Sequence, residues 1–188
     1  MNPIDELKQE HEGVMAALDI LSAIVERFGE NEEIGAVEDL ERLIEFFTIF
    51  VDTCHHGKEE ELLFPALENA GVSKEGGPIG VMLSDHETGR GHVRALRSAL
   101  AGYKAGKRSL AAEIREHADA YAIMLRLHIE KENLVLFHLA DMHLSEETKR
   151  HLEEGFERIE ADRVGLGKHE MFHGMLDQLH KKYPGKSA

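Results

Sequence analysis

The sequence predicts an all-α protein: a four-helix bundle with a C-terminal helical extension. Hydrophobic residues recur at helical spacing along most of the chain, and only four prolines occur among 188 residues. A glycine-rich segment separates two halves that carry the same pattern, a single histidine followed by a His-x3-Glu pair. We therefore expect residues 1–142 to form the bundle and residues 143–188 to form an extension that packs on it.

The first predicted helix starts near Asn2 or Asp5, has Pro3 in its first turn and ends near Phe28. His11 stands where the apolar stripe of this helix would otherwise carry a hydrophobic residue, so its side chain is expected to point inward. The stripe consists of Ile4, Leu7, Val14, Leu18, Leu21 and Val25.

The second predicted helix runs from about Glu33 to Leu67. At the 100° rotation of an α-helix, His56 and Glu60 leave the same face about 40° apart, on the side of the apolar residues. Pro65 lacks an amide hydrogen, so we expect the helix to kink or loosen near Glu61.

A linker is predicted over residues 69–80, where glycines cluster around Pro78. The third predicted helix spans residues 79–104 and again carries one inward histidine, His86. The fourth spans residues 109–142 and carries His128 and Glu132, four residues apart on one face. Its predicted inward series is Leu110, Ile114, His117, Tyr121, Met124, Leu125, His128, Glu132, Val135 and Leu139.

Imidazole and carboxylate groups bind iron, manganese and zinc, and a carboxylate can bridge two ions. The two halves together offer four nitrogens and two carboxylates in the interior of a helical bundle, which suits a dinuclear site. The candidate ligands are His11, His56, Glu60, His86, His128 and Glu132. Mixed nitrogen and oxygen ligands with open positions favour two iron ions, with manganese or zinc as possible substitutes.

Each motif also has a simpler interpretation, because a single His-x3-Glu pair usually stabilises a helix surface by a few tenths of a kcal/mol. Four matched occurrences favour one common site. His55 is turned 100° from His56 and is expected to lie outside the ligand set. His117 is interpreted as a buried polar residue, and His169 with His173 as a solvated pair or a surface ion site.

The net charge of −14 argues against binding to nucleic acid or to anionic lipid. No apolar run approaches the roughly 18 residues of a membrane span, and the first residues do not resemble a signal peptide. The single cysteine, Cys54, excludes an internal disulfide bond. These features predict a cytoplasmic protein, monomeric or homodimeric.

The order His11, His56-x3-Glu60, His86, His128-x3-Glu132 resembles that of the hemerythrin-like, or HHE cation-binding, domains over about residues 4–142. This resemblance implies an up-down four-helix bundle with a non-haem di-iron centre. It further implies His11 and His56 on one iron, His86 and His128 on the other, and both glutamates as bridges.

The chain departs from the oxygen-carrying hemerythrins, in which the third helix offers His-x3-His. The second of these positions is Arg90 here, so one nitrogen ligand is missing, and reversible oxygen storage is not expected. The second iron would be completed either by a water or by another protein oxygen, for which Glu87, Glu59 and Tyr121 are the candidates.

The leading functional hypothesis is a di-iron protein that binds or reacts with oxygen, peroxide or nitric oxide, in sensing, iron handling or detoxification. Peroxide-directed oxidoreductase activity is one form of this hypothesis. The alternative is a regulatory or adaptor module that metal binding completes without redox turnover.

Overall fold

The computed structural model describes residues 2–29, 35–165 and 167–184. Helices account for nearly all of these residues, and no strand occurs among them. The prediction of an all-α fold is therefore confirmed. None of the described helices combines the length and the apolar character that a membrane span requires.

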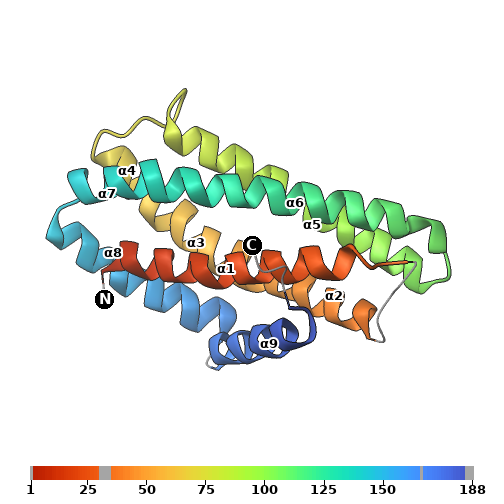
Figure 1. The fold of residues 1–188 in the computed structure, drawn as a ribbon. Helices are drawn as coiled ribbons and strands as arrows, with labels where there is room; N and C mark the ends of the chain where they lie inside the picture. Colours follow the sequence, from red (N-terminus) through yellow and green to blue (C-terminus); the bar gives the residue numbers. More distant parts are fainter. Residues whose placement is uncertain (1, 30–34, 166, 185–188) are drawn as a thin grey trace.

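Four rods of helix form the bundle (Figure 1). The first and third rods are α-helical throughout, whereas the second and fourth rods contain π-helical segments between α-helical ones. The first and third rods are α1 (Pro3–Val25) and α5 (Pro78–Lys104). The second rod consists of α2 (Ala36–Phe46), η1 (Phe47–His55), α3 (His56–Lys58), η2 (Glu59–Leu63) and α4 (Phe64–Asn69). The fourth follows a short 3₁₀ segment, η3 (Arg108–Leu110), and consists of α6 (Ala111–Lys131), η4 (Glu132–Leu136) and α7 (Phe137–His143).

Local sequence signals explain most of the helix ends. The Asn2 side chain accepts a hydrogen bond from the Ile4 amide and caps α1. Of the linker predicted over residues 69–80, residues 70–77 lie between α4 and α5, whereas residue 69 ends α4 and residues 78–80 begin α5. The loosening predicted near Glu61 is confirmed as η2, which directly precedes the turn that contains Pro65. The predicted start of the second helix, Glu33, lies outside the described residues.

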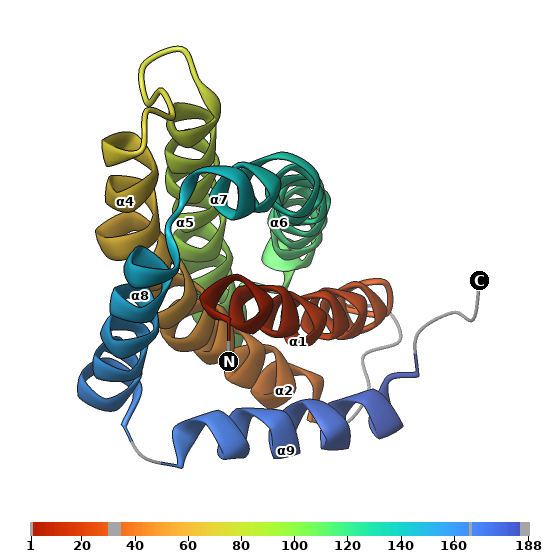
Figure 2. The ribbon, with the colours of Figure 1, turned by 90° about the vertical axis from the view of Figure 1, so that its left-hand side faces the viewer.

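The C-terminal residues form α8 (Glu146–Ile159), η5 (Glu160–Val164) and α9 (Lys168–Lys182). Both α8 and α9 pack on the outside of α1 and of the second rod, as the end-on view in Figure 2 shows. The approach of α8 is close at Gly155, where a Cβ atom would lie 2.7 Å from the end of the Leu62 side chain and would displace it. The side of the second rod that would otherwise face solvent is therefore covered.

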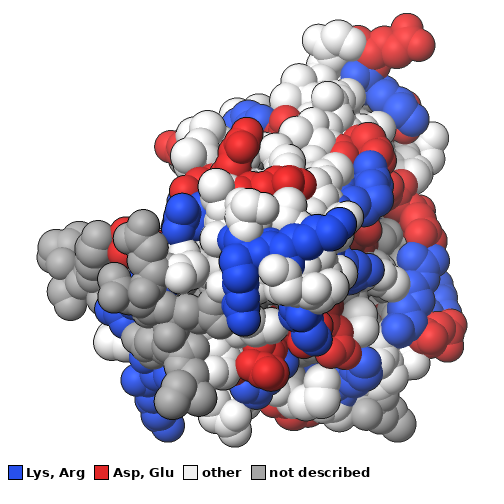
Figure 3. Space-filling model, turned by 90° about the vertical axis from the view of Figure 1, so that its right-hand side faces the viewer, with Lys and Arg blue, Asp and Glu red and all other residues white. Residues whose placement is uncertain are grey.

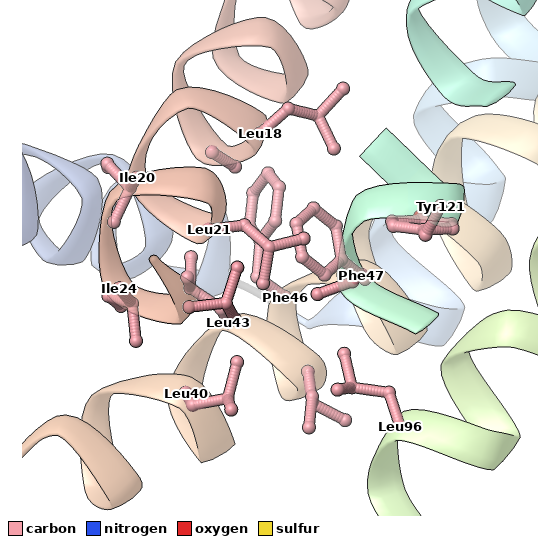
Figure 4. Packing of buried hydrophobic residues seen from close by; sticks show 14 of the residues in the cluster. Leu18, Ile20, Leu21, Ile24, Leu40, Leu43, Phe46, Phe47, Leu96 and Tyr121 are labelled. Atoms are coloured by element: carbon pink, nitrogen blue, oxygen red, sulfur yellow. The ribbon is translucent and has the colours of Figure 1, made fainter. Parts of the chain in front are cut away.

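Two separate hydrophobic clusters fill the bundle. The larger one joins residues of α1, α2 and η1 to α5, α6 and α9, and Figure 4 shows Leu21, Phe46 and Phe47 pointing toward one another within it. The smaller cluster occupies the end that contains α4 and α7. On the surface, acidic and basic side chains are interspersed over the face that Figure 3 shows, so the net charge of −14 forms no continuous acidic patch on that face.

Candidate metal centre

A layer of polar side chains separates the two hydrophobic clusters. On each rod the apolar residues of one cluster end, and those of the other begin, at a buried histidine or glutamate. The residues of this layer are His11, His55, His56, Glu59, His86, His128 and Glu132, and all are at most 4% exposed. Such burial is costly for groups of this kind unless each finds a partner.

The layer divides into two groups of potential ligands. Group A contains His11, His55, Glu59 and Glu132, and group B contains His56, Glu59, His86 and His128. Within each group, one ligand atom from every residue lies within 4.8 Å of the others. In group A the Nε2 atoms of His11 and His55 are 3.1 Å apart, and in group B those of His86 and His128 are 3.2 Å apart.

Both carboxylates extend across the two groups. Glu132 Oε2 lies 3.2 Å from His11 Nε2, whereas its Oε1 lies 3.2 Å from His128 Nε2. Glu59 Oε1 lies 3.6 Å from His55 Nε2, and its Oε2 lies 3.4 Å from His86 Nε2. Each glutamate therefore presents one oxygen to each group, as a carboxylate that bridges two ions would.

The Nδ1 atoms face the opposite way, toward oxygen atoms outside the layer. These contacts join His11 to Asn133 at 3.1 Å, His55 to Glu10 at 2.7 Å, His56 to Asp52 at 3.5 Å, His86 to Glu60 at 2.7 Å and His128 to Asp85 at 3.4 Å. Outer partners of this kind orient metal-binding imidazoles and fix which nitrogen is free. His11, His55, His86 and His128 are thus set to present Nε2 to the centre, whereas the 3.5 Å contact of His56 with Asp52 is not a hydrogen bond.

Six buried atoms of the layer have no hydrogen-bond partner among the described residues. They are both ring nitrogens of His56 and both carboxylate oxygens of Glu59 and of Glu132. An orphaned buried polar group costs about 1–3 kcal/mol, so six of them at one place require an explanation. Two cations between the groups would satisfy the inward-facing atoms, so the donor set fits a dinuclear metal centre.

The electrostatics of the layer differ between its histidines. Burial would lower the pKa values of His55 and His86, but the nearby glutamates outweigh it, raising the pKa of His86 to about 9 and that of His55 above its usual range. Burial, together with the neighbouring imidazoles His86, His55 and His128, holds the pKa of His56 well below its usual range. His56 is therefore neutral at pH 7, which is the form that binds a metal. Burial alone would raise the pKa of Glu132, but the nearby imidazoles of His128 and His11 outweigh it, so the pKa is well below the usual range and the group is a carboxylate.

One predicted ligand is replaced by its neighbour. Glu60 does not enter either group: its side chain is one-quarter exposed, accepts a hydrogen bond from Arg90 at 2.6 Å and lies 2.7 Å from His86 Nδ1. Glu59, which is fully buried, enters both groups instead. The reason is local, because the rod is π-helical at residues 47–55 and 59–63, and the wider turn rotates successive residues by less than the 100° assumed for an α-helix.

The structure brings the other five predicted residues together and adds His55, which was expected to lie outside. His55 and His56 do diverge, but each reaches a different group. The expected pairing of His11 with His56 is therefore wrong: His11 lies with His55, and His56 joins His86 and His128. His56 thereby supplies the third imidazole of group B, although Arg90 stands at the second histidine position of the third helix.

The remaining candidates lie elsewhere. Glu87 is exposed and pairs with Arg94, and Tyr121 is buried outside both groups. His117 is only half-buried and its Nδ1 atom lies 3.4 Å from that of His92. Val135, predicted to face inward, is 48% exposed because η4 moves Leu136 into the core in its place. His169 and His173 stack at 4.7 Å on α9, and neither joins a group of three potential ligands among the described residues.

A family model, the hemerythrin HHE cation-binding domain, matches residues 2–140. The chain belongs to the hemerythrin family. The match contains all seven residues of the two groups and ends before α8, so the C-terminal extension lies outside it. No curated protein matches the chain.

A cavity of about 240 Å³ opens on group B of this hemerythrin-family bundle. Its inner end contains the three imidazoles of group B, and its walls include Tyr121, Met124 and Leu125. Neither His11 nor His55 lines it. Group B is therefore the half of the centre that a small molecule can approach through this cavity.

Proposed function

We propose that the chain holds two iron ions in a dinuclear centre and that this centre binds or reacts with oxygen, peroxide or nitric oxide. The observation that carries the proposal is the set of orphaned atoms on His56, Glu59 and Glu132, which converge with four further imidazole nitrogens. Five imidazoles and two carboxylates match the mixed ligands that iron accepts. When bound, iron would supply the electrons for reaction with an oxidant.

The chain's own residues would hold and shield this centre. Glu59 and Glu132 would each extend one oxygen to either ion, and the histidines would be oriented through their Nδ1 contacts. The hydrophobic clusters cover the layer on both sides. The cavity that reaches only group B would direct a small oxidant to that half of the centre.

Iron content and the visible spectrum test this proposal. We expect two iron ions per chain after aerobic purification, together with absorption bands that change when the protein is reduced and exposed to air. The Glu59→Gln variant should hold less than two ions. Glu61→Gln is the matched control, because Glu61 belongs to the same turn but is half-exposed and pairs with Arg163 at 2.6 Å. A wild-type chain without iron, or equal iron in both variants, would refute the proposal.

A second candidate function is a regulatory module in which metal binding completes the fold and the C-terminal extension carries the signal. It is favoured by the contacts of the extension with the turn that carries Glu59. Arg163 of η5 pairs with Glu61, and α8 packs on α3 and η2. Metal binding to a site that is not preformed contributes folding free energy.

Limited proteolysis distinguishes this candidate. If metal orders the extension, metal-free protein is cleaved between α7 and α9 much faster than metal-loaded protein, while the bundle resists in both states. Equal cleavage rates in the two states would rule out the regulatory function and leave the redox proposal unaffected.

A further inference from the structure

The cavity beside group B extends well beyond the space that a diatomic molecule or peroxide requires. At about 240 Å³ it is slightly smaller than typical small-molecule sites of about 300–1,000 Å³. Along α5 it is lined from His86 to Arg97, eleven residues (97 minus 86), which corresponds to about 16 Å at the rise of an α-helix. The cavity is therefore elongated, with the imidazoles at one end and an exposed arginine at the other.

Apolar atoms make up most of its wall surface, although Asp52 and Asp85 also line it. Phe47, Tyr121 and Leu125 are buried side chains of the core, while Val93 and Met124 are partly buried at the cavity surface. Such walls favour an apolar ligand by the area that they remove from water.

Three arginines line the cavity, and two of them are already paired with acidic groups. Arg90 contacts Asp52 at 2.7 Å and Glu60 at 2.6 Å. Arg94 contacts Glu87 at 3.0 Å in an exposed pair. These two charges are therefore largely compensated.

Arg97 differs from the other two. Its guanidinium donates a hydrogen bond of 2.7 Å to the neutral Thr48 hydroxyl, and no carboxylate of the described residues forms an ion pair with it. The nearby carboxylates are paired with lysines, Glu41 with Lys104 and Glu45 with Lys168. A chain with a net charge of −14 thus presents an uncompensated guanidinium at the entrance of an apolar cavity.

We propose that the cavity binds a medium-chain organic carboxylate, with the apolar chain along Tyr121, Met124 and Leu125 and the carboxylate on Arg97. A guanidinium recognises a carboxylate through two parallel hydrogen bonds, which an oxidant as small as oxygen could not use. The inference deepens the proposed function, on which it rests, because the inner end of the ligand would lie against group B.

Calorimetric titration of the full-length, iron-loaded chain tests the inference. Octanoate should bind, and shorter carboxylates should bind about fourfold more weakly for each methylene removed. Octylammonium, which has the same chain with the opposite charge, should bind much more weakly than octanoate. Absence of octanoate binding, or equal affinity for both compounds, would overturn the inference.

Variants locate the site. Arg97→Gln should weaken octanoate binding about fivefold, and Val93→Phe, which fills the cavity, should abolish it. Arg126→Gln is the matched control, because Arg126 is paired with Asp19 and does not line this cavity. An affinity that Arg97→Gln leaves unchanged would contradict the proposed orientation. Arg97 is exposed, so this variant folds even if Val93→Phe does not.

Iron content, measured on the same samples, separates the two proposals. Two iron ions without octanoate binding would overturn the inference alone. A wild-type chain without iron would overturn the proposed function, whatever the affinity for octanoate.

Discussion

Replacing Glu59 by methionine should shift the stability of the metal-free and the metal-loaded protein in opposite directions. Glu59 is fully buried, and neither of its oxygens has a hydrogen-bond partner among the described residues. Leaving such a group unsatisfied costs about 1–3 kcal/mol, and methionine has a similar shape without the charge. The metal-free Glu59→Met variant should therefore be about 2 kcal/mol more stable than the metal-free wild type.

With metal bound, the wild type should be more stable than Glu59→Met, which reverses the order expected for the metal-free proteins. At a free metal concentration of about a thousand times Kd, binding stabilises the wild type by about 4 kcal/mol. At about 2–4 °C per kcal/mol for a chain of this size, that corresponds to a rise of roughly 8–16 °C in Tm. Glu59→Met removes the carboxylate that extends to both groups, so most of this rise should disappear.

Differential scanning calorimetry with and without a chelator measures both effects. Glu60→Met provides a graded comparison, because Glu60 contacts His86 from outside the layer and its loss should weaken metal binding only about 10–100-fold. The reasoning is refuted if metal-free Glu59→Met melts below the metal-free wild type. It is also refuted if Glu60→Met loses more of the metal-induced rise than Glu59→Met does.

Three further predictions concern other parts of the chain. His55→Ala should lower the iron content measured by atomic absorption, because His55 Nε2 lies in group A. His92→Ala should leave the iron content unchanged, because His92 lies outside both groups. Equal iron contents in the two variants would contradict this prediction. Lys58→Met should lower the free energy of unfolding, measured by denaturant titration, by about 3–5 kcal/mol. The reason is that Glu10 stays buried without the Lys58 amine, which lies 2.6 Å away. The double variant Lys58→Met/Glu10→Leu should recover much of this loss, and a double variant as unstable as Lys58→Met would contradict the explanation. Burial alone would raise the pKa of Asp39, but hydrogen bonds from Lys182 and Tyr183 outweigh it and lower the pKa below 3.8. The ionised Asp39 therefore stabilises the folded chain above that pH, and this contribution is lost as the pH falls further. Asp39→Asn should therefore release α9 to proteases at neutral pH, and an unchanged cleavage rate would argue against this anchor.

The sequence predicted the rods and most of the polar layer because both depend on regular spacing. His11 and His86 interrupt apolar stripes of ordinary α-helices, so their inward direction follows from a rotation of 100° per residue. His128 and Glu132 also lie on one face as predicted, because the π-helical segment of the fourth rod starts only at Glu132.

The second rod was harder to predict, since Phe47–His55 and Glu59–Leu63 are π-helical and no residue pattern used in the prediction distinguishes these turns from α-helical ones. Glu60 was therefore preferred to Glu59. His55 was expected outside the ligand set because it is turned 100° from His56, whereas two groups side by side accept two diverging histidines.

The position of the extension depends on tertiary contacts. The apolar face of α8 is clear in the sequence, but the surface that it covers is decided by residues far away, such as Leu62 against Gly155. Cys54 and Lys58 are buried in the second rod, on the part of it against which α8 and η5 pack.

The π-helical turn at Glu59–Leu63 has a consequence for the length of the second rod. A π turn contains one residue more than the α turn it replaces. Deleting a single residue there would restore an ordinary α turn that covers nearly the same rotation, so that Leu63 and Leu67, now fully buried, would stay in the core. The surplus residue thus changes the rod only locally, at the polar layer, and a lineage could gain or lose it without rebuilding the far end of the bundle.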